Sequence, residues 1–244
     1  MSPTQTRRDF LKKTATVAGL TTVAPGMLFY SVSQAKPDGE AVTSKVRWGM
    51  LIDTTKCADG CNDCVNACTK EHGLNDNVRA EIAPQWIRKV GLRDKQTGKE
   101  TSLPMLCQHC ENPPCVDVCP TGASFKRADG IVLVDKHTCI GCRYCMMACP
   151  YKARSFVHEN LENQKPHSPR GKGTVESCTF CVHKVDKGEQ PACVEACSDS
   201  NHKAMIFGDI KDPESEISKK LAEVSSIALR ADMKLNPGVR YQGI

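Results

Sequence analysis

Short apolar segments separated by long polar connections are the dominant pattern of this 244-residue chain. Residues 46–53 (VRWGMLID) and 131–135 (IVLVD) are apolar runs of strand length, and residues 154–157 and 205–207 are shorter runs of the same kind. Runs of this length, bounded by turn residues, favour β-strands over helices. The pattern therefore predicts short strands joined by many loops, with little helix.

Two of the longer connections carry local signals of their own. Residues 85–91 and 102–105 lie on either side of a polar turn at residues 94–99, an arrangement that predicts a β-hairpin. Residues 161–174 are rich in Pro, Gly, Ser and Lys and predict an exposed loop. Trp48 and Trp86 are expected in the core.

The C-terminal part of the chain, residues 211–244, is predicted to be a helix followed by an extended arm. Asp212 followed by Pro213 is typical of an N-cap and a first helical position, and it predicts a helix over residues 213–229. The arm after it is expected to be a solvated tail or to lie on a partner. We expect this helix and the loop at residues 161–174 to be contact surfaces.

The N-terminus has the pattern of a Tat signal peptide over residues 1–35. Arg7 and Arg8 are twin arginines, a weakly apolar stretch follows, and the sequence ending at Ala35 resembles a signal-peptidase site. This predicts export to the periplasm, with residues 36–45 as a polar linker. Retention of the stretch as a membrane anchor is the alternative, although it is short for a transmembrane helix and Pro25 interrupts it.

Charge and composition narrow the function class. The formal net charge is +5, and residues 1–35 account for three of those charges, so the remainder is close to neutral. A nearly neutral chain lacks the basic face that nucleic acid requires, so we expect no nucleic-acid partner. Aromatic residues make up only 5% of the chain, which is thin for an ordinary core of this size. Metal–ligand bonds can supply the missing cohesion.

Sixteen cysteines in four consecutive quartets supply those ligands. The third quartet, CIGCRYCMMACP, begins at Cys139 and matches the C-x2-C-x2-C-x3-C-P run of bacterial ferredoxins. The second quartet has the same ending with a longer middle, the first has one extra residue after Cys57, and the fourth contains an insertion at residues 182–192. A [4Fe–4S] cluster takes four thiolates, so the count predicts four [4Fe–4S] clusters without remainder.

Disulfides, zinc and covalent haem are the competing roles for these cysteines. Eight disulfides would suit a small secreted domain, but a chain of this length does not need them. Zinc ribbons use two separated C-x2-C pairs and not the run seen in the third quartet. Covalent haem requires C-x-x-C-H, which is absent from the sequence. An exported metal-binding protein without redox activity stays open as an alternative.

The four quartets, the strand before each odd-numbered one and the insertion in the fourth resemble the four-cluster ferredoxin subunits of membrane-bound oxidoreductases, such as the dimethyl-sulfoxide, polysulfide and nitrite reductases. The Tat signal and the first quartet make the chain most similar to the periplasmic iron–sulfur subunits of the transmembrane complex associated with dissimilatory sulfite reductase. The resemblance covers residues 46–210. It implies an α+β fold of two ferredoxin-like units with long loop insertions, plus the C-terminal helix and arm.

The resemblance also implies how the quartets pair. In this family quartet one pairs with four and quartet two with three, and the last cysteine of each quartet crosses to the other cluster of its pair. Carried over to this sequence, the ligand sets are Cys57, Cys61, Cys64 and Cys197 (cluster 1); Cys178, Cys181, Cys193 and Cys68 (cluster 2); Cys107, Cys110, Cys115 and Cys149 (cluster 3); and Cys139, Cys142, Cys145 and Cys119 (cluster 4).

A non-catalytic role follows from the residues and the resemblance together. No acid–base pair or nucleophile motif is present, and a cluster with four thiolates has no open iron. The resemblance implies that the chain relays electrons between an integral membrane, quinone-interacting subunit and a multihaem cytochrome c or other redox subunits. It also implies a role in sulfur metabolism and docking at a membrane through these partners. The alternative is the same module serving a periplasmic molybdopterin reductase.

Four residues near the cysteines carry further expectations. His109 and His183 could donate hydrogen bonds to cluster sulfurs, but exposed loop histidines are the favoured interpretation for both. Arg143 and Tyr144, inside the third quartet, are expected on the surface.

Overall fold

The computed structural model of the chain describes residues 41–244 except 59, 75–78, 80, 99 and 163. The Tat signal expected at residues 1–35 and the first half of the linker lie outside the described residues. Within them, no helix combines the length and apolarity that crossing a bilayer would demand.

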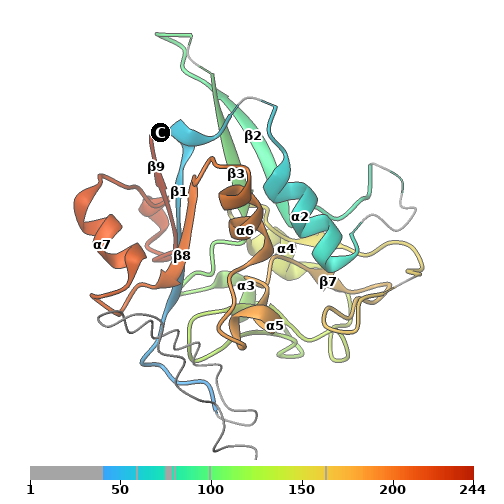
Figure 1. Cartoon of the computed structure of the whole chain (residues 1–244). Coiled ribbons are helices and arrows are strands. Elements are labelled where there is room, and N and C mark those ends of the chain that lie inside the picture. Colours follow the sequence, from blue (N-terminus) through green and yellow to red (C-terminus); the bar gives the residue numbers. More distant parts are fainter. Residues whose placement is uncertain (1–40, 59, 75–78, 80, 99, 163) are drawn as a thin grey trace, which may run out of the picture. The chain divides into compact units, whose positions relative to one another are not determined.

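Nine strands and six short α-helices make up the described structure (Figure 1). The strands are β1 (Trp48–Asp53), β2 (Ile87–Arg93), β3 (Glu100–Leu106), β4 (Ser124–Lys126), β5 (Val132–Val134), β6 (Ser155–Phe156), β7 (Val175–Glu176), β8 (Met205–Asp209) and β9 (Val239–Gln242). The helices are α2 (Asp63–His72), α3 (Pro114–Asp117), α4 (Tyr144–Ala148), α5 (Val182–Val185), α6 (Ala192–Asp199) and α7 (Glu216–Glu223), with 3-10 turns at Thr54–Lys56 and Ala231–Met233. The strands predicted from the apolar runs are confirmed at β1, β5, β6 and β8.

A three-stranded sheet of order β8-β1-β9 joins the two ends of the described chain (Figure 1). Strand β1 pairs antiparallel with β8 and parallel with β9. As the central strand it is buried on both faces, which explains its continuous apolar sequence. Gly49 allows the close approach of its neighbours, because a Cβ there would lie 2.7 Å from the carbonyl oxygen of Gly238.

The same strand–helix arrangement occurs twice around the quartets. Strand β1 precedes the first quartet and pairs with β8, which follows the fourth; β4 follows the second quartet and pairs with β5, which precedes the third. The helices repeat this pairing, because α2 packs on α6 and α3 packs on α4. The internal repeat expected of two ferredoxin-like units is therefore present, and the α+β fold class is confirmed.

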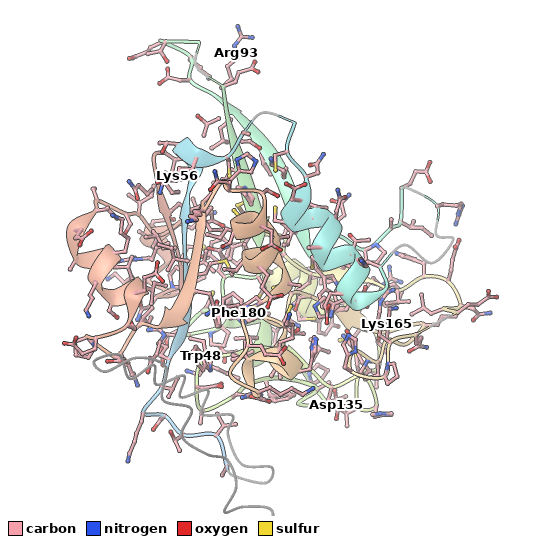
Figure 2. All side chains as sticks on the ribbon, viewed as in Figure 1. Trp48, Lys56, Arg93, Asp135, Lys165 and Phe180 are labelled. Atoms are coloured by element: carbon pink, nitrogen blue, oxygen red, sulfur yellow. The ribbon has the colours of Figure 1, made fainter. Side chains whose placement is uncertain are left out.

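The predicted hairpin is also confirmed. Strands β2 and β3 pair antiparallel from Ile87 opposite Leu106 to Arg93 opposite Glu100, and the turn begins where Gly98 donates its amide to the carbonyl of Asp94. Figure 2 shows Arg93 at the far tip of this hairpin, away from the body of the protein. Its inner end is buried at Trp86 and Ile87, as expected for Trp86. Trp48 is only partly buried and stacks on Phe207, with ring centroids 5.3 Å apart.

The predicted C-terminal helix is present as α7, but its predicted bounds and the solvated tail are wrong. The helix α7 is shorter than residues 213–229, because Ser215 caps it by accepting a hydrogen bond from the Ser218 amide and the chain becomes extended at Val224. The arm is not a solvated tail, since it forms β9 beside β1 and fully buries the side chain of Tyr241. Its hydroxyl donates to the Pro104 carbonyl at 3.0 Å, so the arm is part of the core.

The loop at residues 161–174 is only partly exposed, which corrects the prediction for it. Ser168, Arg170 and Thr174 are buried there. Arg170 forms two hydrogen bonds of 2.9 Å to Glu176, and both side chains are almost completely buried. A paired arginine in the interior satisfies its charge locally, so this loop is fastened to β7 rather than free in solvent.

Candidate cluster sites

Quartets one and four end on the helices α2 and α6, whereas the last cysteines of quartets two and three follow the short helices α3 and α4. Cys64 and Cys68 lie four residues apart on α2, and Cys193 and Cys197 have the same spacing on α6. Residues four apart face the same side of a helix, so each helix presents two sulfurs toward its packing partner. This explains how one cysteine of a quartet can serve its own cluster while another reaches across.

All sixteen cysteines are free thiols, and most are buried. Burial is the main cause that raises the pKa of the Cys64 and Cys181 thiols to about 11 and that of Cys107 and Cys110 to about 12. A thiol with such a pKa keeps its proton at neutral pH unless a metal replaces it. Sixteen thiols are the number that four [4Fe–4S] clusters require, and none of them is paired in a disulfide.

Quartets one and four share two groups of thiols. Besides burial, the pKa of Cys64 is raised by the neighbouring thiols of Cys57, Cys197 and Cys61, which form the first group. The second group contains Cys193, Cys181, Cys68 and Cys178. Burial raises the pKa of Cys193, and the thiols of Cys181 and Cys68 raise it further. Burial also raises the pKa of Cys178, followed by the thiols of Cys68 and Cys193. These are the two sets that the family resemblance implies for clusters 1 and 2.

Quartets two and three form the other two groups. Cys107, Cys110, Cys115 and Cys149 line one small cavity together with apolar residues such as Pro114 and Val132. Next to it, the pKa of Cys145 is raised by burial and then by Cys139 and Cys119. Cys142, which the family resemblance assigns to the same cluster, is exposed.

The four groups form a series. Cys193 of group 2 is influenced by Cys64 of group 1, Cys178 of group 2 by Cys107 of group 3, and Cys115 of group 3 by Cys145 of group 4. Each group thus neighbours the next in the order 1–2–3–4.

Backbone geometry around the sulfurs fits an anionic group. The amides of Ser124, Phe180 and Ala204 donate to the sulfurs of Cys119, Cys178 and Cys197 at 3.3–3.4 Å. Such N–H···S bonds are among the features that stabilise clusters and set their potentials. Gly141, between Cys139 and Cys142, has a φ of +70°, and a Cβ there would lie 2.1 Å from the Gly173 carbonyl oxygen. The tight loop of the third quartet therefore requires glycine.

Arg154 is a buried cation between groups 3 and 4. Its Nη2 donates to Cys115 Sγ at 3.1 Å, while its Nε and Nη1 have no partner among the described residues. Burial disfavours the charge, but the thiols of Cys115, Cys107 and Cys145 raise the pKa of Arg154 above its ordinary value. Unpartnered N–H groups at the cavity of group 3 need acceptors, and the sulfur atoms of a cluster are suitable ones.

The expectation of an exposed loop histidine is wrong for both His109 and His183. His109 is buried, stacks on Phe180 and accepts a hydrogen bond from the Val132 amide at 3.0 Å. His183 is partly buried and contacts Glu71 rather than a sulfur. The histidine that touches a cysteine is His72, which lies 3.3 Å from Cys181 Sγ and 2.8 Å from the Ser168 hydroxyl. Sequence reasoning missed it because His72 stands outside every quartet.

The surface expectations for the third quartet are confirmed. Tyr144 is 53% exposed, and Arg143 lies over the ring of Phe156 at 4.2 Å. Ile140 and Met147 are each 67% exposed, although both are apolar. Group 4 is therefore bordered by exposed apolar side chains.

Comparisons with known proteins agree with this architecture. Two models of a 4Fe-4S dicluster domain match residues 55–123 and 99–210. The chain is 44% identical over 262 residues to the "Hdr-like menaquinol oxidoreductase iron-sulfur subunit 1" of Archaeoglobus fulgidus, spanning 96% of this chain and 97% of that protein. It is 36% identical over 245 residues to a tetrathionate reductase subunit of Salmonella typhimurium, and this match spans 98% of this chain and 88% of that protein. It is 40% identical over 181 residues to protein NrfC of Escherichia coli, and this match spans 73% of this chain and 72% of that protein.

The chain belongs to the family of [4Fe–4S] ferredoxin subunits of membrane oxidoreductases. It carries four [4Fe–4S] clusters, two for each dicluster domain, and its sixteen cysteines fit that number. It is an electron-transfer subunit of an oxidoreductase complex and not the catalytic subunit.

Proposed function

We propose that the four thiol groups are the ligand sets of the four clusters, as the family resemblance implies. Support comes from the mutual influence of the thiols within each group and from the cavity that group 3 lines. Cys142 would complete group 4 from its exposed position. Bound there, the clusters supply one-electron redox chemistry, and the chain's own contribution is to space and insulate them.

We further propose that electrons enter or leave through cluster 4. The series of neighbouring groups carries this proposal, because it leads from group 1 to a group whose edge is open to solvent. Ile140, Tyr144 and Met147, which lie within the sequence of the third quartet, are large and exposed. Clusters of exposed apolar side chains on soluble proteins mark sites of protein association, and a partner seated there would bring its own redox group close to Cys142.

The complex we propose is a respiratory one in sulfur metabolism. The relative from Archaeoglobus fulgidus is named as a subunit of a menaquinol oxidoreductase, and the two chains match over nearly their full lengths. We propose that an integral membrane, quinone-interacting subunit docks at cluster 4 and that a multihaem cytochrome c and other redox subunits complete the path. Export by the Tat route would place the folded, cluster-loaded protein in the periplasm, attached to the membrane through these partners.

A second candidate is supported by the tetrathionate reductase relative, whose identity of 36% also extends over almost the whole chain. In that case the module would serve a periplasmic molybdopterin reductase. The clusters and their ligands would be the same, and only the partner would differ.

Anaerobic purification of the intact complex from native membranes tests these proposals. We expect about 16 irons in each copy of this chain, co-purification with a membrane subunit and a cytochrome, and reduction of the clusters by menaquinol. A molybdenum subunit in place of the cytochrome would establish the second candidate. Clusters that menaquinol fails to reduce in the intact complex would refute the quinone link.

A further inference from the structure

Three side chains outside the cluster groups converge at the surface beside group 2. Glu71 comes from the last turn of α2, His167 from the loop before β7, and His183 from α5. Glu71 Oε1 lies 2.7 Å from His183 Nε2 and 3.3 Å from His167 Nε2. The ligand atoms of all three lie within 4.8 Å of one another.

We propose that Glu71, His167 and His183 form a mononuclear binding site for a divalent transition-metal ion of the zinc type. Zinc binds imidazole nitrogen and carboxylate oxygen at about 2.0–2.1 Å in a tetrahedron, which places its ligand atoms about 3.3–3.4 Å apart. The separation of 3.3 Å between Glu71 Oε1 and His167 Nε2 matches that value, and the separation of 2.7 Å to His183 Nε2 is shorter. To admit the ion, Glu71 Oε1 must move away from His183, and His167 Nε2 must give up its 2.9 Å contact with the carbonyl oxygen of Glu71.

The chemistry of the three ligands selects the kind of metal. Two imidazoles with one carboxylate suit zinc or its first-row neighbours, whereas magnesium and calcium prefer oxygen ligands throughout. The carboxylate also supplies negative charge next to both imidazoles. Three protein ligands leave a fourth position for water.

The surroundings give the ion both access and a rigid frame. The His183 side chain is 16% exposed and that of His167 is 37% exposed, so the site opens to solvent on one side. Two surface hollows meet at His167, one also lined by Glu71 and Glu195 and the other by His183. On the inner side, the ring of His72 packs edge-on against His183 with centroids 5.5 Å apart.

Such a site would cross-link three segments that hold cluster 2. Glu71 follows Cys68 by three residues and His183 follows Cys181 by two, so one ion would join both ligand-bearing segments to the loop that carries His167. The ion would fasten the chain around the cluster from outside, without taking any cysteine from it.

Metal analysis of the full-length, cluster-loaded protein tests this site. The protein is treated anaerobically with a chelator, given one equivalent of zinc chloride and desalted, and zinc and iron are then counted together with the zinc X-ray absorption spectrum. We expect one zinc per chain with all four clusters retained, and a first shell of nitrogen and oxygen at about 2.0 Å. Failure to retain zinc, or zinc with sulfur neighbours at about 2.3 Å, would overturn the proposal.

Two variants and a matched control localise the ion. His167→Ala removes one ligand, and Glu71→Gln keeps the size of the side chain but removes its charge. Each variant should weaken zinc binding at least about 10-fold, because even the loss of a residue that only hydrogen-bonds to a metal ligand lowers the affinity by about that much. His158→Ala removes an exposed histidine elsewhere and should retain the zinc. Iron counts and visible absorption show that each variant is folded, and unchanged zinc affinity in both ligand variants would contradict the assignment.

Discussion

Replacing Arg154 by methionine removes the buried cation between groups 3 and 4 while keeping a side chain of similar length. The guanidinium contacts Cys115, and its surroundings are thiols rather than carboxylates, so the change leaves no acidic partner behind. A reduced cluster carries one more negative charge than an oxidised one, so a nearby cation stabilises the reduced form. We therefore expect Arg154→Met to lower the reduction potentials of clusters 3 and 4.

The size of the shift follows from the geometry. The Nη2–Sγ contact of 3.1 Å places the guanidinium charge beside the site of cluster 3. At a separation of about 6 Å and an effective dielectric constant of about 20, one unit charge contributes about 3 kcal/mol. For a one-electron couple this corresponds to about 120 mV. Clusters 1 and 2, which lack contact with Arg154, should shift far less.

Redox titrations followed by electron paramagnetic resonance measure these potentials directly. Arg143→Met is the matched control, because Arg143 lies inside the third quartet but is exposed, and water weakens the effect of its charge about fourfold. Arg154→Lys should restore part of the shift, since it keeps the charge and loses the planar fork. A change below about 20 mV in clusters 3 and 4 with full iron content, or an equal change in all four clusters, would refute the electrostatic reasoning.

The remaining predictions concern other parts of the chain. Deleting residues 238–244 removes β9 with its two fully buried side chains, which costs about 3–6 kcal/mol of apolar burial. Anaerobic iron assays should then show loss of iron from clusters 1 and 2, whereas full iron content would show that β9 is dispensable. Gly141→Ala should lower the iron count by about four because of the clash with Gly173, whereas Gly91→Ala, with open space around it, should leave the count unchanged. Met147→Glu should impair assembly with partner subunits while the isolated chain keeps its clusters, which native electrophoresis of membranes can measure; normal assembly would argue against docking at cluster 4. Arg8→Lys should hold the protein on the cytoplasmic side in fractionation experiments, and unaltered export would exclude the Tat route.

Local patterns account for the parts of the fold that the sequence could predict. The β2–β3 hairpin and the strands β1, β5 and β8 follow from runs of a few residues, and the cysteine count predicts the clusters through simple stoichiometry. The pairing of strands that lie far apart in the sequence could not be predicted in this way. The sequence of β9 does not indicate that it lies parallel to β1, almost two hundred residues earlier, because such contacts depend on the whole packed arrangement.

In the candidate site, too, local sequence patterns were predictable and tertiary contacts were not. The cysteines were identifiable from spacing alone, whereas the roles of His72 and Arg154 depend on tertiary contacts with Cys181 and Cys115. His109 was expected to be exposed because it lies in a polar loop, yet stacking on Phe180 buries it. Phe180 itself is fully buried, and Figure 2 shows it within the body of the protein.

The position of β1 between β8 and β9 has a consequence for biogenesis. Strand β1 leaves the ribosome long before either of its neighbours in the sheet. The intervening quartets two and three can fold while synthesis continues, but the unit built by quartets one and four can close only after β8 and β9 have been made. A polypeptide that lacks β8 and β9 would thus be left with β1 unpaired, so completion of this sheet can act as a checkpoint before cofactor loading is finished.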